Sequence, residues 1–466
     1  MTLLIKNGRV LDPATGLDDY VDVLVEDGKI RALSKGIEPG AQRREASITV
    51  IDATGLMILP GLIDMHTHLR EPGHEYKETI KSGSCAGAAG GFTSLVCMAN
   101  TNPPNDSASV TEYILEKARK EACTNIFPVG ALTKGLRGES LTEIGELKEA
   151  GVVALSDDGH SAKSASVMRR GLEYAKNFSL PVICHCEDHN LSARGVMHEG
   201  ITSAYLGLQG IPSIAEEIIV ARDIALSEWT RHPVHIAHVS TAGSVRIIRE
   251  AKSRGVFITA ETAPHYFTLT EEAVGTFDTS TKVNPPLRSA KDVEAIKEGL
   301  RDGTLDVIAS DHAPHSSLEK DVEYDEAAFG IIGLETSLPL TLSLVAQNDL
   351  SLKQAAEKLT CNPARVLNIN KGSLTIGSDA DITIVDLNAE YAVDINAFKS
   401  KSKNSPFHRW RLKGCARYTI VSGKIVFQAS TRTEEPVCSL LLSSDSPDYL
   451  RLFSYSIPRI YFSLSQ

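Results

Sequence analysis

The chain has 466 residues, of which 42% are hydrophobic and 23% charged, and its net charge is −11. This composition is typical of a globular protein, and the absence of a long Lys/Arg run argues against a nucleic-acid partner. No stretch approaches about 20 apolar residues, so no membrane span is predicted, and the apolar start is too short for a signal peptide. The eight cysteines lack the spacing of a disulfide framework, which predicts free thiols in a reducing cytoplasm.

The first 57 residues read as short strands joined by turns. Leu3–Ile5, Asp22–Val25 and Ile30–Ala32 have the apolar character of strands, and Asn-Gly and Asp-Gly pairs nearby are typical of hairpins. We therefore expect this segment to be all β.

The central body alternates strand and helix patterns. Eight short apolar runs are predicted strands: Leu59–Met65, Thr93–Met98, Ile126–Val129, Val152–Leu155, Pro181–Cys184, Val234–Ala237, Val256–Thr259 and Leu305–Ala309. Helical segments such as Glu112–Glu121 and Ser244–Ser253 lie between them. This alternation predicts an α/β fold, a (β/α)₈ TIM-type barrel over residues 58–368, with a doubly wound open sheet as the alternative.

The C-terminal part returns to strands. Thr383–Asp386 and Tyr418–Ile425 look like strands, the second broken by a turn at 422–424. We expect residues 369–430 to join residues 1–57 in one small β-sandwich domain. Residues 431–466 are a Ser-rich tail whose role and order the sequence leaves open.

His66-Thr67-His68 follows the first predicted barrel strand. Residues two apart on a strand share one face, so both imidazoles point into the barrel mouth, where neutral nitrogens can hold a divalent metal. A lone His-x-His is often only a surface or core pair. The position at the carboxyl end of a barrel strand favours the metal, because barrel active sites are built there.

Three more metal-type side chains end barrel strands: His185, His238 and Asp311. A buried carboxylate is costly unless it is paired or bound to metal. Asp157-Asp158-Gly159 follows the fourth strand, and strand alternation lets only one of these aspartates face the metals. The alternative for this motif is an acidic turn.

Other polar residues near these strand ends suit a pocket for an anionic, amide-bearing substrate. They are Arg70, Asn100, Asn284 and His315. Arginine is suited to holding a carboxylate by two hydrogen bonds. We read His235 as structural, whereas His265 could line the pocket or satisfy a loop.

These stretches resemble the dihydroorotase branch of the amidohydrolase superfamily, from about residue 4 to 428. The motifs that carry the resemblance are His66-Thr67-His68-Leu69-Arg70-Glu71-Pro72-Gly73, Ala99-Asn100-Thr101, Asp157-Asp158-Gly159, His185-Cys186-Glu187, His238-Val239-Ser240-Thr241 and Asp311-His312-Ala313-Pro314-His315. The Leu-Arg-Glu-Pro-Gly continuation is the most specific, because related hydantoinases, dihydropyrimidinases and allantoinases usually lack it.

The resemblance implies zinc-dependent, reversible hydrolysis of (S)-dihydroorotate to N-carbamoyl-L-aspartate in pyrimidine biosynthesis. By it, His66 and His68 bind one zinc, His185 and His238 a second, and Asp158 bridges them. Asp311 contacts the metal and moves protons. Arg70, Asn100 and His315 hold the substrate carboxylate, and Asn284 lines the pyrimidine side of the pocket.

The chain departs from the wider superfamily at its fourth strand. Many members carry a carboxylated lysine there, whereas this strand ends in aspartates and Lys163 follows later. Long bacterial dihydroorotases resemble this chain in that respect, and some hold one zinc and need aspartate carbamoyltransferase. One or two zinc ions, this partner and a homodimer are therefore expected. The alternatives are another cyclic amidohydrolase or a non-catalytic assembly partner.

Overall fold

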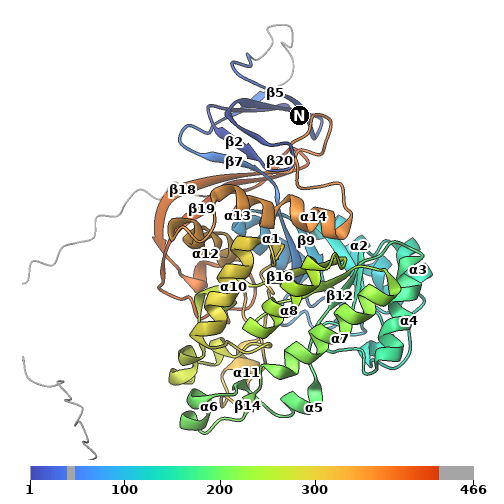
Figure 1. Ribbon diagram of the computed structural model, residues 1–466. Coiled ribbons are helices and arrows are strands. Elements are labelled where there is room, and N and C mark those ends of the chain that lie inside the picture. Colours follow the sequence, from blue (N-terminus) through green and yellow to red (C-terminus); the bar gives the residue numbers. More distant parts are fainter. Residues whose placement is uncertain (1, 39–47, 430–466) are drawn as a thin grey trace, which may run out of the picture. The chain divides into compact units, whose positions relative to one another are not determined.

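Eight parallel strands form the central sheet of the protein (Figure 1). The computed structural model describes residues 2–38 and 48–429, so the tail considered above lies outside the described residues. In hydrogen-bonded order the strands are β8 (Leu62–Thr67), β9 (Phe92–Cys97), β10 (Asn125–Gly130), β11 (Ala154–Ser156), β12 (Val182–Cys184), β15 (Val234–Ile236), β16 (Ile258–Thr262) and β17 (Val307–Ile308). Beyond β17, Thr67 bridges to His312, and the His68 N–H donates to the His312 carbonyl over 2.9 Å. This contact closes the sheet, and the predicted barrel is confirmed.

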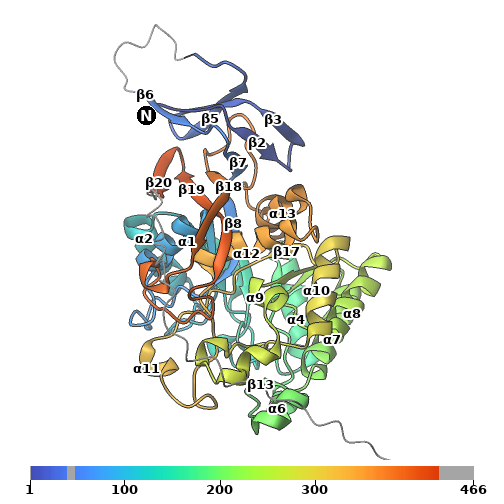
Figure 2. The ribbon, with the colours of Figure 1, turned by 90° about the vertical axis from the view of Figure 1, so that its left-hand side faces the viewer.

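A main helix follows each barrel strand and packs on the outside of the sheet (Figure 2). In chain order these helices are α1 (Ile80–Gly90), α2 (Ala108–Glu121), α3 (Ile144–Ala150), α4 (Ala165–Lys176), α7 (Ile214–Thr230), α8 (Ala242–Ser253), α10 (Ala290–Asp302) and α12 (Leu334–Ala346). In α4 the buried residues Met168, Gly171, Leu172 and Ala175 recur at helical spacing, which gives the helix one apolar face. Burial of such faces against the strands builds the core around the barrel.

Shorter elements fill the loops between these units. They are α5 (His189–Ser192), β13 (Met197–His198), α6 (Ile201–Leu206), β14 (Gly210–Ile211), α9 (Pro264–Thr268) and α11 (Ser317–Lys320), and α13 (Leu352–Leu359) and α14 (Cys361–Leu367) follow α12. Among the described residues no helix has both the length and the hydrophobicity to cross a membrane.

Two further sheets complete the fold, and the second of them combines strands from both ends of the chain. The first has the order β5 (Lys29–Ser34), β4 (Asp22–Glu26), β1 (Thr2–Lys6) and β6 (Ile48–Asp52); the second has β20 (Lys424–Gln428), β19 (Arg411–Val421), β18 (Ile382–Ala392), β7 (Met57–Pro60), β2 (Arg9–Asp12) and β3 (Leu17–Tyr20). Leu3, Val23, Ile58 and Ile382 lie in one buried cluster between them. The expected sandwich is therefore present.

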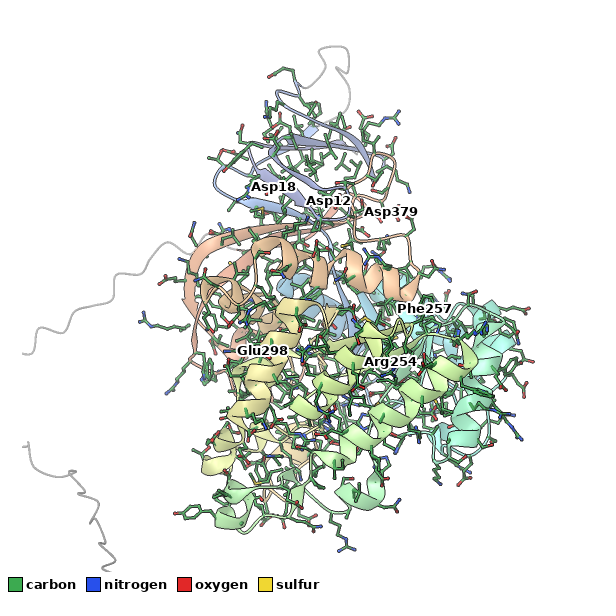
Figure 3. All side chains as sticks on the ribbon, viewed as in Figure 1. Asp12, Asp18, Arg254, Phe257, Glu298 and Asp379 are labelled. Atoms are coloured by element: carbon green, nitrogen blue, oxygen red, sulfur yellow. The ribbon has the colours of Figure 1, made fainter. Side chains whose placement is uncertain are left out.

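Polar contacts also join the two ends of the chain. Asp12, drawn in Figure 3, accepts hydrogen bonds from the Leu374 N–H over 2.8 Å and from the Ser373 hydroxyl over 3.3 Å. Asp379 pairs with Lys29 over 2.6 Å. The limits of 1–57 with 369–430 and of 58–368 stay predictions.

The first predicted barrel strand, Leu59–Met65, is divided in the structure. Residues up to Pro60 belong to β7, which pairs with β18 and β2, and the barrel strand β8 begins only at Leu62. Gly61 lies between them, and a Cβ there would come within 2.1 Å of the Thr93 hydroxyl on β9. The chain thus passes from the sandwich to the barrel at Gly61, where a residue with a Cβ would clash with β9.

Gly61→Ala should lower the free energy of unfolding by about 1–3 kcal/mol, because the buried Thr93 has no room to give way. Urea unfolding checks this result. Gly275→Ala is the matched control, since a Cβ there meets no atom within 4 Å. Equal loss in both variants would contradict the steric explanation.

Candidate metal centre

Six polar side chains selected from the sequence lie together at the carboxyl end of the barrel strands. Each is at most 5% exposed. His66 is the fifth residue of β8, and the others follow the strands β8, β11, β12, β15 and β17: His68, Asp158, His185, His238 and Asp311. Because parallel strands end at one rim, residues up to 245 positions apart in the sequence converge there.

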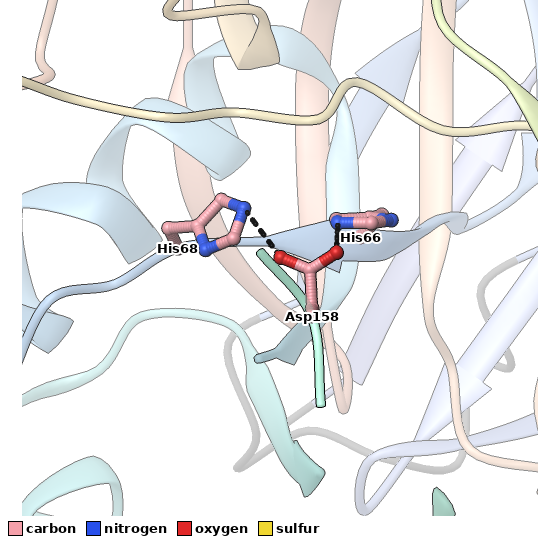
Figure 4. Close-up of side chains that lie close together, drawn as sticks. All are labelled: His66, His68 and Asp158. Carbon is pink, nitrogen blue, oxygen red and sulfur yellow. Dashed lines mark ion pairs between the residues drawn. The ribbon is translucent and has the colours of Figure 1, made fainter. Parts of the chain in front are cut away.

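The carboxylate of Asp158 is shared by two groups of histidines. Its Oδ1 lies 3.2 Å from His66 Nε2, and its Oδ2 lies 3.5 Å from His68 Nε2 (Figure 4). Oδ1 also lies 3.5 Å from His238 Nε2 and 3.8 Å from His185 Nδ1. Within each group the candidate ligand atoms are all within 4.8 Å of one another. Asp158 therefore has the position of a bridge between two ligand sets.

Asp311 lies beside the first of these sets. Its Oδ1 is 3.3 Å from His68 Nε2 and 3.6 Å from His66 Nε2. Its backbone φ is +48°, and His238 and Arg70 also have positive φ, at +34° and +62°. Such conformations cost about 1–3 kcal/mol each in residues with a Cβ. Three of them around one cluster indicate that the fold holds these side chains in place at the expense of stability.

Charges of opposite sign control the ionisation of the cluster. Burial alone would raise the pKa of Asp158, but the neighbouring His66, His238 and His68 hold it well below its usual range. Burial alone would lower the pKa of His66, but Asp158 and Glu261 hold it well above its usual range. Both carboxylates of the cluster are thus ionised, because the pKa of Asp311 is also lowered by the histidines despite its burial.

The donor set fits a divalent metal. His66 Nε2 and Asp158 Oδ1 are buried and lie 3.2 Å apart, and among the residues that the structure describes neither makes a well-aligned hydrogen bond. His185 Nδ1 lies only 2.9 Å from His238 Nε2, so two ring nitrogens face the same point. Buried unpaired donors and acceptors are costly unless something binds them. Imidazole nitrogens and carboxylate oxygens are the ligands of zinc and similar metals.

Three residues fix how the histidine rings are turned. Glu261 Oε1 lies 2.5 Å from His66 Nδ1, Asn100 Oδ1 lies 2.8 Å from His68 Nδ1, and Glu187 Oε2 lies 2.9 Å from His185 Nε2. Each acceptor keeps a proton on one ring nitrogen and leaves the other nitrogen free for the centre. The sequence analysis missed Glu261 and Glu187 in this role. The signals that could have found them are their places, near the end of β16 and two residues after His185.

The four candidate substrate residues are placed differently. Arg70 donates to the Pro314 carbonyl over 3.2 Å and to His315 Nε2 over 3.3 Å, so these two candidates lie together. Burial and the charges of Arg70 and Lys77 lower the pKa of His315 to about 2, which keeps it neutral. Asn100 contacts His68, and the Asn284 amide donates to Glu187 over 2.8 Å.

The other candidates lie outside the two groups of ligand atoms. Asp157 accepts hydrogen bonds from the Thr133 N–H and hydroxyl, so only Asp158 of the pair faces the histidines. Lys163 pairs with Glu139 at the surface. His235 Nε2 lies 3.2 Å from Glu261, which makes it a partner of that carboxylate. His265 is 2% exposed, and burial lowers its pKa to about 4.

Family sequence models match most of the chain. A model described as "Dihydro-orotase-like" matches residues 55–244, and one described as "Amidohydrolase family" matches residues 209–427. A protein of Geobacter metallireducens named "Dihydroorotase" is 56% identical over 428 residues, which cover 92% of this chain and 100% of that protein. One of Acetivibrio thermocellus with the same name is 55% identical over 91% of this chain and 98% of its own.

Solved structures with the same fold include two cyclic amidases. The L-hydantoinase (dihydropyrimidinase) of Arthrobacter aurescens is 27% identical with a TM-score of 0.81, covering 91% of this chain and 96% of that one. The dihydropyrimidinase of Brevibacillus agri is 25% identical with a TM-score of 0.79, covering 92% and 95%.

Glu261→Gln should weaken metal binding by about 10–100-fold, because the neutral amide no longer holds His66 in the required tautomer. Competition with a chromophoric chelator measures this affinity. Glu335→Gln is the control. Glu335 accepts hydrogen bonds from the backbone N–H groups of Lys399 and Ser400, away from the cluster, so this variant should bind metal with wild-type affinity. Wild-type affinity in Glu261→Gln would remove it as a positioning residue.

Proposed function

The chain belongs to the dihydroorotase family, and on this premise we propose that its buried His–Asp cluster is the zinc centre of that reaction. The enzyme hydrolyses the ring amide of (S)-dihydroorotate to N-carbamoyl-L-aspartate and catalyses the reverse ring closure in pyrimidine biosynthesis. The observation that carries the proposal is the carboxylate of Asp158, which faces two pairs of histidines at once.

His66 and His68 would hold one zinc ion and His185 and His238 a second, with Asp158 between them. A divalent metal supplies Lewis acidity, which lowers the pKa of water toward about 7 and polarises a carbonyl. Two ions follow from the two complete ligand sets. A single ion is the alternative, and it would use one set only.

Asp311 is proposed as the group that moves the proton. Its carboxylate is ionised, since the surrounding histidines lower its pKa. In ring opening it accepts a proton from the attacking water and delivers it to the departing ring nitrogen, and in ring closure it moves the proton back. Its contacts with His66 and His68 hold it beside the proposed metal position.

Arg70 and His315 are proposed to bind the substrate carboxylate. The guanidinium offers charged donors in a fixed plane, and neutral His315 accepts one of its hydrogen bonds at Nε2, which orients the guanidinium toward the substrate. The Asn100 amide, turned by its bond to His68, would add a further donor, and Asn284 would face the pyrimidine side. A positive anchor of this kind favours dihydroorotate over the uncharged rings that hydantoinases accept.

We also propose a cytoplasmic homodimer that can associate with aspartate carbamoyltransferase. Cys85, Cys97, Cys123, Cys184, Cys186 and Cys361 are not in disulfides, which fits a reducing compartment. Ile201 and Tyr205 on α6 are 91% and 89% exposed, and apolar surface of this kind supports a contact with another chain. Light scattering of the purified chain tests the dimer.

Assay of the purified chain with dihydroorotate, hydantoin and allantoin tests the function, together with metal analysis. Turnover of dihydroorotate alone and one or two zinc ions per chain are expected. Activity only after addition of aspartate carbamoyltransferase would support the partner. Turnover of hydantoin or allantoin instead would favour the other cyclic amidases, and absence of both zinc and turnover would favour a non-catalytic protein.

Asp311→Asn should lower kcat by about 100–10,000-fold with little change in substrate affinity, because the amide cannot accept the proton. Steady-state kinetics and equilibrium binding of dihydroorotate measure the two effects. Asp157→Asn, one buried carboxylate turned away from the cluster, is the control and should keep its kcat. Wild-type turnover in Asp311→Asn would refute its role.

Arg70→Met should raise KM about 10–100-fold, because a charge-assisted contact with the carboxylate is lost. Initial rates over a wide range of dihydroorotate concentration measure KM. The exposed Arg365→Met, on α14, serves as the control for loss of a positive charge. A KM at the wild-type level would assign the carboxylate to another residue.

A further inference from the structure

Two cysteines outside the metal centre lie within reach of each other. Cys85 is on α1 and Cys123 follows α2, and their Sγ atoms are 3.1 Å apart. Both side chains are partly exposed, whereas Cys97 and Cys184 are buried in the barrel. We propose that Cys85 and Cys123 form a thiol–disulfide exchange site, which small-molecule disulfides such as oxidised glutathione convert into an intramolecular disulfide.

The backbone around the pair holds the two thiols in position. The Cys123 N–H donates to the Ser84 hydroxyl over 3.2 Å, and that hydroxyl donates to the Lys81 carbonyl over 2.9 Å. Ser84 is fully buried, so the segment after α2 is fixed against the middle of α1. A disulfide has an S–S distance of about 2.05 Å, so the thiols need to approach by only about 1 Å.

The surroundings favour Cys123 as the thiolate. The hydrogen bond between the two thiols lowers the pKa of Cys123, and the charge of Lys81 acts in the same direction. The pKa of Cys85 is raised by the same contact. Thiolates, not thiols, attack disulfides, so Cys123 is the attacking residue and Cys85 the resolving one.

The exchange proceeds in two balanced steps. Cys123 thiolate attacks one sulfur of oxidised glutathione, the glutathione S–S bond breaks, and one glutathione thiolate leaves and takes up a proton from water. Cys85 then loses its proton to water, attacks the Cys123 sulfur of the mixed disulfide and releases the second glutathione. The two cysteines are oxidised by two electrons in total, and the oxidised glutathione is reduced to two glutathione thiols.

The new bond would join two helices that also support the Arg70 loop. Glu71 accepts a hydrogen bond from the Ile80 N–H, at the start of α1, over 2.9 Å. Its other oxygen lies 3.3 Å from Lys117 Nζ on α2. A disulfide between Cys85 and Cys123 closes a loop of 38 residues across the same two helices, which restricts the unfolded chain. Oxidation is thus expected to stabilise this part of the barrel.

The test treats the reduced full-length chain with oxidised glutathione and then blocks free thiols with N-ethylmaleimide. Non-reducing peptide mapping should find a Cys85–Cys123 bridge, and the intact mass, taken before the blocking step, should fall by two hydrogen masses. The Tm should rise by about 4 °C, and dithiothreitol should reverse both changes. The amide of Ile80 should exchange more slowly with deuterium in the oxidised protein.

Single-serine variants separate the two roles. Cys85→Ser should keep one glutathione on Cys123, because the resolving thiol is missing. Cys123→Ser should react at least tenfold more slowly at Cys85, because the attacking thiolate is missing. Neither variant should gain Tm on oxidation. A glutathione adduct without the bridge in the wild-type chain, or a bridge to Cys415 instead, would overturn the proposal.

Discussion

The centre depends on one constraint. A buried carboxylate must have its negative charge balanced, on two sides, by positive charges or metal ions. Removing Asp158 from water costs several kcal/mol unless its charge is compensated. Four imidazoles supply that compensation, and they come from three different strands of the barrel. The barrel makes this arrangement possible because the carboxyl ends of all its strands lie at one rim. The positive φ angles of His238 and Asp311 show that the geometry of this rim is kept even though it strains the backbone at these two residues.

Much of the architecture could be predicted because apolar runs and strand ends are visible in a sequence. The alternation of strand and helix patterns predicts the barrel, and the fold is confirmed. Its carboxyl-terminal rim then indicates where His66, His185, His238 and Asp311 meet, since each follows or ends an apolar run. The resemblance to the dihydroorotase family is confirmed as well. Which metal these residues hold, and how many ions, stays a prediction.

Other features escaped because they depend on pairing between distant residues. The seventh strand was expected at Val256–Thr259, whereas β16 covers Ile258–Thr262 and includes the buried Glu261. From the sequence alone, a glutamate is expected to be exposed. In the structure, two histidines from other strands compensate the charge of Glu261. Gly61 is a second case, because Thr93 on the next strand leaves no room for a Cβ at this position. Local patterns cannot reveal either partner.

The bridge between Thr67 and His312 has a consequence for how the protein is made. It joins the first barrel strand to the segment after the last one, where the Ser310 N–H also donates to Asp64 of β8, and it lies beside His66, His68 and Asp311. A ribosome releases the first two histidines long before the residues that complete their surroundings. In the nascent chain the sheet therefore cannot close through this bridge until the segment around residue 312 has been synthesised. A chain that ends before that point lacks the partner of Thr67 and cannot close its sheet through this bridge.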